Sequence, residues 1–468
     1  MEVGQLLDVL SRGLDSRGAK DASHIELRAD DTIQLAIDVR DDRVEVLSQR
    51  SDLGHSARVL CDGSWGFAVS HGIRDIGSTV ADAATVARAV GDHDDDDRVK
   101  LADVRSQKRS IKSGLEMPLD EVSNSDKLRF LQGVCVSVRN SDPRISTVRA
   151  SYRELTGKRY LVTDEGTVSE MEVSSIYLMC TASGADGSRV GSARDEVARA
   201  STGWELFEDT EPKERISERL VRKLRGQLDG VACKRGSFHC VLGPRVVGML
   251  AHEALGHLSE ADYFASGAFA GKEGKLIAPE DVSMVDSPKV KDGFGNIDLD
   301  DEGVAPVKVT LIEHGRLKDK MTNREWAARL GCRPTGSARA ETYRVPPIIR
   351  MRNTYFEKGD QSLEELLEGV KSGYYCGDVR GGQAEANSSF QVAIQDCYEV
   401  KHGEIGKPVR NLAISGIALD SLRLIDGLGK DFGMESSYCG KSDQYMATSD
   451  GGPHMRFLKG GIIFGGEE

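Results

Sequence analysis

Residues 211–230 read EPKERISERLVRKLRGQLDG, and this stretch divides the chain into two parts of different character. Apolar residues recur in it every four positions: Ile216, Leu220, Leu224 and Leu228. That spacing places the four side chains on one face of an α-helix, and Gly230 follows where a helix is expected to stop. We therefore predict a long amphipathic helix here. We place a domain boundary at its end, which separates domain 1–230 from domain 231–468.

The residues ahead of this helix predict a mixed α/β domain. Residues 25–50, IELRADDTIQLAIDVRDDRVEVLSQR, alternate between apolar and polar side chains in the manner of strands joined by polar turns. Residues 57–72, ARVLCDGSWGFAVSHG, add a second β stretch. Leucines near the start of the chain predict an amphipathic helix: Leu6, Leu7, Leu10 and Leu14. A second, short helix is expected at 81–90.

Local turn signals add detail to this part. Residues 150–182 predict hairpins, with turns expected at TGK (156–158) and at TDEGT (163–167). The acidic run Asp94–Asp97 predicts a solvated loop in preference to a cation site.

The residues beyond the helix predict a mainly β domain. SFHCVLG (237–243) is strand-like, and a helix is expected over Pro244–Leu258, because proline is common in the first turn of a helix. From about residue 280 short strands dominate, and His-Gly pairs at 314–315 and 402–403 mark turns between them. The whole chain is therefore predicted to have an α+β fold, with the mixed domain first and the mainly β domain second.

The composition disfavours several classes of protein. The 468 residues carry a formal net charge of −13, whereas a surface that binds duplex nucleic acid needs a basic face. No run reaches the roughly 18–20 apolar residues of a membrane span, and the start does not read as a signal peptide. The nine cysteines are scattered and form no CxxC pair, which is typical of free thiols in a reducing compartment. A soluble, cytoplasmic protein is predicted.

The segment MLAHEALGH (249–257) carries the chemistry. His252 and His257 bracket Glu253, as in the zinc motif in which two histidines four apart share a helix face and a glutamate acts as general base. Here the histidines are five apart. Five steps of a regular helix rotate a side chain by about 140°, against about 40° for four steps. A shared metal therefore predicts a π-bulge or an unwound turn between them, where Gly256 would give backbone freedom.

A catalytic zinc usually has three protein ligands and one open position for water. The two histidines leave one ligand to be found, and the residues by themselves leave four options open: Glu260, Asp262, His454 and a cysteine. Glu260 lies three residues past His257, and His454 lies in a glycine-rich tail.

The segment HEALGHLSEAD (252–262) resembles the HExxxH segment of the TldD/PmbA family, metallopeptidases that are also called modulators of DNA gyrase. Further stretches follow in the order that the family shows: IDLDDEGVAP (297–306), LIEHGRLKD (311–319), PTGSARAETYRVPPIIRMRNTY (334–355), YCGDVRGGQAE (375–385) and GMESSYCGKSDQ (433–444). GHSARVLCDGSWGFAVSH (54–71) is similar to the family's GVRxxxxGxxGFA-type stretch. The resemblance covers nearly the whole chain.

This resemblance implies a mixed α/β N-terminal domain and a C-terminal β pseudo-barrel. It implies one zinc ion per active subunit, held by His252, His257 and the cysteine of the CGK segment, Cys439. All the metal residues are present, so the chain resembles the TldD type and not the PmbA/TldE paralogue, which lacks the motif. Where the family usually reads CGKxGQ this chain reads CGKSDQ, and Asp443 in place of glycine predicts a changed turn.

The predicted function is zinc-dependent hydrolysis of unfolded peptides or small unfolded proteins, with Glu253 activating a zinc-bound water. The many strands of the second domain favour capture of the substrate as an added β-strand. The resemblance also implies a dimer, either a homodimer or a heterodimer with a PmbA/TldE-like paralogue. One alternative is a non-catalytic regulatory or binding subunit of such a complex. The other is a gyrase modulator that binds DNA or topoisomerase directly, which the acidic charge disfavours.

Two further clusters are candidates for a role. An acidic cluster could support the metal site from outside or form a surface turn: Asp300, Asp301 and Glu302. A basic cluster could bind a peptide carboxylate or lie on a solvated strand face: Arg339, Arg344, Arg350 and Arg352.

Overall fold

The computed structural model describes residues 3–15, 17–90, 98–385 and 387–466. The acidic run at 94–97 lies outside the described residues. Among the described residues no helix has the length and the apolar content needed to cross a membrane.

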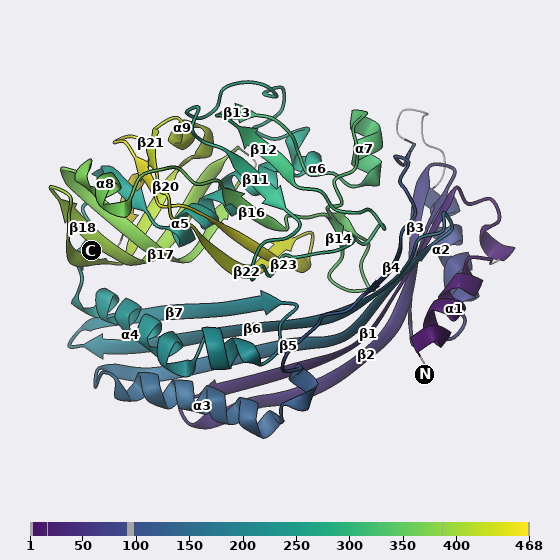
Figure 1. The fold of residues 1–468 in the computed structure, drawn as a ribbon, viewed down its shortest axis with the longest axis horizontal. Helices are drawn as coiled ribbons and strands as arrows, with labels where there is room; N and C mark the ends of the chain where they lie inside the picture. The colour runs from purple at the N-terminus through teal and green to yellow at the C-terminus, as the bar shows by residue number, and fades with distance from the viewer. Residues whose placement is uncertain (1–2, 16, 91–97, 386, 467–468) are drawn as a thin grey trace.

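A curved seven-stranded sheet dominates the N-terminal half, and its long strands extend along most of the molecule (Figure 1). Its strands are β1 His24–Arg40, β2 Arg43–Cys61, β3 Ser64–His71, β4 Lys108–Ile111, β5 Ile145–Thr163, β6 Val168–Asp186 and β7 Arg189–Ala200. The order is β3-β2-β1-β5-β6, and β4 and β7 pair with different parts of β6. The strands and turns predicted from 25–50, 57–72 and 163–167 are confirmed.

The turn predicted at TGK (156–158) is wrong, because these residues lie inside β5 and pair with β1. Gly157 has a φ of +132°, and a Cβ atom there would come within 2.3 Å of the carbonyl oxygen of Asp31. The glycine is therefore needed for the close approach of two long strands and not for a reversal of the chain.

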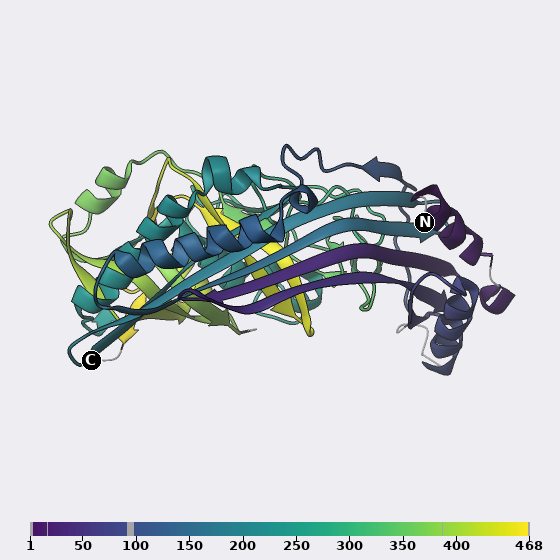
Figure 2. The same ribbon diagram turned by 90° about the horizontal axis from the view of Figure 1, so that it is seen from below.

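Four helices cover the two ends of this sheet (Figure 2). The pair α1 (Val3–Gly13) and α2 (Ile76–Val90) packs at one end, and the pair α3 (Asn124–Asn140) and α4 (Lys213–Asp229) packs against β5, β6 and β7 at the other. Helix α4 is the helix predicted at 211–230. Its four apolar residues are all buried in the core beneath it.

The C-terminal half contains two larger sheets. The ten-stranded sheet comprises β8 Val231–Ala232, β9 Gly236–Ser237, β10 His239–Leu242, β17 Ser372–Ala384, β18 Ser389–Lys401, β19 Glu404–Arg410, β20 Leu412–Ile417, β21 Ile425–Leu428, β24 Met455–Phe457 and β25 Ile463–Gly466. The six-stranded sheet comprises β11 Met284–Ser287, β12 Val309–Glu313, β13 Arg316–Leu317, β16 Asn353–Phe356, β22 Gly433–Lys441 and β23 Gln444–Gly452. A short pair is formed by β14 (Ala338–Arg339) and β15 (Ile348–Ile349).

Helix α5 (Pro244–Met249) contacts strands of both large sheets. The start of the motif segment, residues 249–257, therefore lies between the two sheets. The ten-stranded sheet has free ends at β21 and β9, so the hydrogen bonds between its described strands do not close a ring. The predicted α+β class is confirmed, with a mixed N-terminal half and a mainly β C-terminal half. Both His-Gly turns are also confirmed, at the β12–β13 and β18–β19 hairpins.

The acidic cluster joins the two halves and is largely buried, not a surface turn, and no hydrogen bond or ion pair connects it to His252, His257 or Cys439 among the described residues. Asp300 and Glu302 are buried, with 1% and 3% of their surfaces exposed. Glu302 accepts hydrogen bonds from the Arg58 guanidinium and from the backbone N–H of Arg324, each at 2.9 Å. The Arg324 side chain in turn binds Glu165 through two bonds of 2.7 Å. These contacts connect the curved sheet to the C-terminal half.

Three of the four arginines of the basic cluster are buried: Arg339, Arg350 and Arg352. Arg350 donates to the carbonyl oxygens of Cys439 and Gln444, so it holds the β22–β23 hairpin. Arg352 is fully enclosed and forms an ion pair with Asp286 at 2.5 Å. The fourth, Arg344, pairs with Asp52 of the N-terminal sheet. Since each arginine is engaged within the chain, the peptide-carboxylate role predicted for the cluster finds no support.

The ion pair between Arg352 and Asp286 predicts a large effect on stability. Both side chains are fully buried, so Asp286→Asn leaves an unpaired charge in the core. We expect the free energy of unfolding to fall by about 3–5 kcal/mol. The shift of the denaturation midpoint measures this. Lys308→Gln, which removes an exposed partner of Glu357 at 2.8 Å, is the control and should change stability by less than about 1 kcal/mol. Equal shifts for the two variants would contradict the prediction.

Candidate metal centre

The motif segment departs from regular α-helical geometry between His252 and His257, as their five-residue spacing requires for a shared metal. Helix α5 ends at Met249, residues Leu250–Gly256 form a π-helical turn, and a 3₁₀ turn follows at His257–Ser259. The N–H of His257 donates to the carbonyl oxygen of His252, five residues earlier. In a π-turn, residues five apart lie on the same side of the helix. The predicted distortion is therefore confirmed.

The role of Gly256 differs from the one expected. Its φ of −61° is ordinary helical backbone, so the π-turn does not depend on a glycine conformation. A Cβ atom at this position would come within 2.2 Å of the sulfur of Met351 and 2.9 Å of the carbonyl oxygen of Ala251. Glycine is therefore required by the close packing of β15–β16 residues against the turn.

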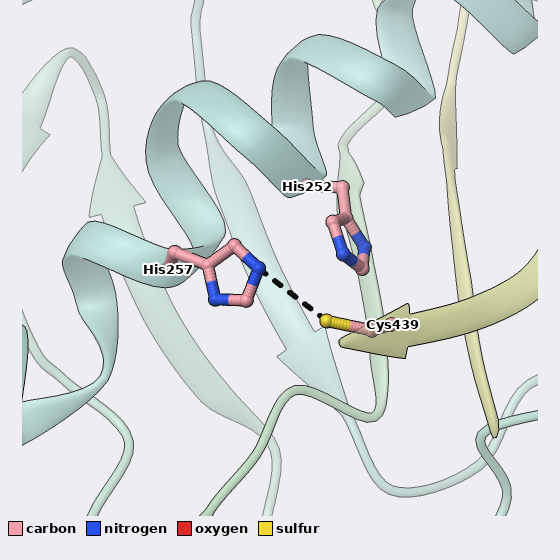
Figure 3. A group of neighbouring side chains, drawn as sticks. All are labelled: His252, His257 and Cys439. Carbon is pink, nitrogen blue, oxygen red and sulfur yellow. Dashed lines mark hydrogen bonds between the residues drawn. The ribbon is translucent and has the colours of Figure 1, made fainter. Parts of the chain in front are cut away.

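Three side chains that are far apart in the sequence meet at one point (Figure 3). One ligand atom each from His252, His257 and Cys439 lies within 4.8 Å of the others. The two imidazole rings are perpendicular, with centroids 5.2 Å apart, and both come from the motif segment. Cys439 projects from β22, and its sulfur lies 3.3 Å from Nε2 of His257. The structure brings together the three residues that the resemblance implies.

The donor set fits a zinc ion. Zinc–nitrogen bonds of about 2.0–2.1 Å and zinc–sulfur bonds of about 2.3 Å in a tetrahedral site place two donors roughly 3.5 Å apart. The separation of 3.3 Å between sulfur and Nε2 is close to that value. Nδ1 of His252 is buried and has no hydrogen-bond partner among the described residues. Two imidazoles and a thiolate are ligands that favour zinc over magnesium or calcium.

Charge within the group favours the thiolate form of the cysteine. Burial alone would raise the pKa of Cys439, but the adjacent His252 and His257 outweigh it and lower the pKa to about 4. Burial opposes charge on His252 as well, and Cys439 outweighs it, raising the pKa of this histidine to about 9. A cysteine with such neighbours is a reactive or metal-ligating residue and not an inert core thiol.

Glu260 is a hydrogen-bond partner of His257 and not a member of the group of three donor residues. Its carboxylate accepts from Nδ1 of His257 at 3.1 Å and from Nζ of Lys441 at 2.9 Å. Burial would raise the pKa of Glu260, but His257 and Lys441 lower it to about 2. A carboxylate at this position fixes the orientation of His257, so that its Nε2 faces Cys439.

The other two options for a third ligand lie outside the group. Asp262 pairs with Lys441 at 2.7 Å. His454 is held by Asp431 at 2.6 Å and by the hydroxyl of Tyr375 at 3.1 Å.

The turn beside Cys439 tolerates the departure from the family pattern. Ser442 and Asp443 link β22 and β23 with φ values of 51° and 58°. A two-residue hairpin with positive φ at both positions is a type I′ turn, in which aspartate is accepted as well as glycine. Asp443 therefore occupies an ordinary hairpin turn, and Cys439 remains paired with Met446 in the strand register.

Glu253 is half-buried, and no hydrogen bond or ion pair engages its side chain among the described residues. Its charge acts on Asp450 of β23, a residue that the sequence did not single out. Burial raises the pKa of Asp450 to about 6, with a contribution from Glu253, while His252 opposes the rise. Asp450 is thus close to both the donor group and Glu253. Its position in a glycine-rich strand offered no recognisable signal.

Three family models match successive parts of the chain. They are the PmbA/TldA metallopeptidase domain 1 at residues 25–90, the central domain at 118–228 and the C-terminal domain at 235–462. The last of these contains His252, Glu253, His257 and Cys439.

Relatives and solved structures agree with these matches. A zinc metalloprotease TldD homolog of Saccharolobus solfataricus is 35% identical over 94% of this chain and 96% of its own length. A metalloprotease of Methanothermobacter thermautotrophicus is 32% identical over 92% of this chain and 94% of its own. The crystal structure of TldE from Thermococcus kodakarensis shares the fold, with a TM-score of 0.77 and 20% identity over 98% of this chain and 100% of that one. A putative modulator of DNA gyrase from Thermotoga maritima has a TM-score of 0.78 and 20% identity over 99% and 100%. This chain belongs to the PmbA/TldD family of metallopeptidases.

Proposed function

We propose that this chain is a zinc-dependent peptidase in which His252, His257 and Cys439 hold one zinc ion per active subunit. The observation that carries the proposal is the convergence of the three donor atoms within 4.8 Å, produced by a π-turn and a strand from the far end of the chain. The names of both relatives support the same class of reaction, and that of the Saccharolobus solfataricus relative also names zinc. In this proposal 231–468 is the catalytic domain, and 1–230 is a separate mixed α/β domain.

The chain's own residues supply the proton transfers. Zinc, when bound, would polarise the scissile carbonyl and lower the pKa of a bound water. Glu253 accepts the proton of the attacking water and later delivers it to the leaving amine. It follows His252 directly and has no competing partner among the described residues, so its carboxylate is available for this role. Glu260 holds His257 in place through the hydrogen bond to Nδ1.

The substrate class that we propose is unfolded peptide, or small unfolded protein, bound as an added strand. Strand β22, which carries Cys439, is the last strand of the six-stranded sheet, so one of its edges is unpaired in the described part of the chain. An extended peptide can hydrogen-bond to such an edge through its main chain with little dependence on sequence. A folded protein offers no free extended segment to this edge and would escape cleavage.

We also propose a dimer, either of two copies or with a PmbA/TldE-like paralogue. The measured mass of the purified chain, alone and after mixing with such a paralogue, distinguishes the two. The competing hypothesis is that the chain is a non-catalytic regulatory or binding subunit. Against it stands the retention of His252, Glu253, His257 and Cys439 together.

The experiment that tests the proposal combines metal analysis with peptide cleavage. We expect about one zinc per active subunit, and cleavage of a denatured protein but not of its folded form. Removal of the metal by a chelator should abolish cleavage, and zinc should restore it. A metal-free chain with full activity, or a zinc-loaded chain that is inactive both alone and with the paralogue, would contradict the proposal.

The hydrogen bond from His257 to Glu260 yields a separate prediction. Glu260→Gln keeps the shape of the side chain but removes the buried charge that orients His257. We expect zinc affinity to fall by roughly 10–100-fold, measured by competition with a chelator. Glu313→Gln is the control, because Glu313 also binds a lysine, Lys318 at 2.6 Å, but is exposed. Zinc affinity within about twofold of the parent in Glu260→Gln would show that the carboxylate does not position the ligand.

A further inference from the structure

A polar cavity lies between the two halves of the chain, apart from the three donor residues. Its volume is about 290 Å³. One wall is the β7 segment 196–199, and the opposite wall is the β22 segment 434–436. Both strands are at the edges of their sheets, and they pass beside each other (Figure 1). Glu211, helix α4, the first turn of α5 and residues 377–378 of β17 complete the lining. The cavity therefore has two unpaired strand edges within it.

The lining carries an excess of positive charge. Six basic residues face four acidic ones: Arg199, Arg215, Arg219, Arg222, Lys223 and Arg245 against Glu196, Glu211, Asp378 and Glu435. Several of the cations are neutralised within the chain. Arg245, for example, pairs with Asp378 at 2.7 Å and also with Glu435.

Arg199 is one of two cations of the cavity wall that no carboxylate neutralises in the described part of the chain. It has no carboxylate partner among the described residues. Its Nη1 donates only to the neighbouring carbonyl oxygen of Ala198, and its Nε is buried without any partner there. Arg215 at the start of α4 is exposed and also has no carboxylate partner in the described ranges. A guanidinium with free donors at a strand edge is suited to a carboxylate.

Glu435, the acidic residue that β22 contributes to the cavity, is only partly ionised near neutral pH. Burial raises the pKa of Glu435 to about 7, although Arg245 opposes the rise. Partial loss of this negative charge increases the positive potential in the cavity.

The cavity is connected to the metal centre along β22. Ser436 precedes Cys439 by three residues and Glu435 precedes it by four, which corresponds to roughly 10–13 Å of extended chain. Tyr438 lies between them in sequence, and its ring packs against Tyr177 of β6 with centroids 5.2 Å apart. The neighbouring strand β23 follows the same path, since Asp450 pairs in register with the cavity residue Glu435 and Met446 pairs with Cys439. A strand bound along β22 would therefore reach both places.

We propose that this cavity binds a carboxylate of the peptide substrate, three to four residues away from the bond that is cleaved, and that Arg199 is the residue that recognises it. The inference rests on the proposed peptidase function for its substrate, but the site is built from residues outside the catalytic group. The carboxylate has two sources in peptides: the chain's own C-terminus, or the side chain of aspartate or glutamate at the matching position.

Binding of three labelled octapeptides of the same uncharged sequence tests the proposal. One has a free C-terminal acid, one has a C-terminal amide, and one is an amide with an aspartate three residues beyond the intended scissile bond. Fluorescence anisotropy is measured on the full chain carrying Glu253→Gln, so that no peptide is consumed. We expect at least one carboxylate peptide to bind about tenfold more tightly than the plain amide, and Arg199→Gln to remove that preference. Preference for the acid identifies the C-terminus, and preference for the aspartate peptide identifies a side chain.

One control outside the cavity and one further variant inside it test whether the preference depends on the cavity. Arg189→Gln removes an exposed arginine from the other end of β7, outside the cavity, and should leave the preference unchanged. Arg215→Gln removes the exposed cation of the cavity and should weaken the preference without affecting the fold. Equal binding of all three peptides, or a preference that survives Arg199→Gln, would overturn the proposal.

A cleavage assay distinguishes failure of the cavity proposal from failure of the proposed peptidase function. With Glu253 present, mass spectrometry of the products should give a main fragment of three or four residues on the carboxylate side for the preferred peptide. A carboxylate preference that depends on Arg199 in a chain that cleaves nothing would refute the peptidase and retain the cavity. Cleavage at equal rates of acid, amide and aspartate peptides, unaffected by Arg199→Gln, would retain the peptidase and refute the cavity.

Discussion

Glu253→Ala is expected to reduce kcat/KM for peptide cleavage by about 10²–10⁴-fold, because general base catalysis contributes an effect of that size. The zinc content should not change. Glu253 lies next to His252 in sequence, but it is not among the three residues whose donor atoms converge. Its side chain has no hydrogen bond in the described part of the protein that its loss would break. The effect should therefore appear in the rate and not in metal binding or in the fold.

Three measurements on one preparation check this result: the cleavage rate, the zinc content by elemental analysis and the midpoint of thermal unfolding. Glu253→Gln serves as the matched variant, since it keeps the shape of the side chain and cannot act as a base near neutral pH. Both variants should be inactive and fully loaded with zinc. Retention of full activity in either of them would remove Glu253 from the mechanism, and loss of zinc in both would assign it a ligand role.

Cys439→Ser is expected to lower zinc affinity by more than about 100-fold. Loss of even an outer partner of a ligand costs roughly 10–100-fold, and Cys439 contributes a donor atom directly. His252 and His257 lower the pKa of the Cys439 thiol to about 4, so a thiolate is present near neutral pH. A serine hydroxyl is not ionised under the same conditions and cannot replace it. Peptide cleavage should fall with the zinc content.

The control for this variant is Cys332→Ser, which changes an exposed thiol far along the chain from the donor group. Its zinc content and activity should match those of the parent. Competition with a chelator of known affinity measures the loss in Cys439→Ser. An unchanged zinc stoichiometry and affinity in this variant would transfer the third ligand position to Glu260, which already contacts His257.

Local sequence patterns were sufficient to predict helices and strands where interactions between neighbouring residues determine the structure. The four-residue spacing of apolar side chains predicted α4, and alternation predicted the long strands β1 and β2. The five-residue spacing of His252 and His257 was informative for a different reason. Only a π-turn or an unwound helix can place both rings on one side, so the spacing and the requirement for a shared metal together implied the distortion that the structure contains.

Family resemblance pointed to Cys439, but no local pattern could, because it lies 182 residues beyond His257. The same limit applies to Glu260 and Asp450, whose roles depend on which strands pass beside the π-turn. It also explains the turn wrongly predicted at Gly157. Glycine there permits contact with a strand more than a hundred residues away, and local turn statistics contain no information about that contact.

The sequence by itself therefore determined most of the long helices and strands, the α+β class and the demand for a distorted helix, since interactions between near neighbours decide these features. The tertiary structure alone decided the support of His257 by Glu260 and the cavity between β7 and β22, whereas Cys439 followed from the family resemblance and not from a local pattern. Each of these depends on the packing of two sheets whose contacts are distant along the chain, and packing over such distances is specified by the whole set of side chains and not by any one segment.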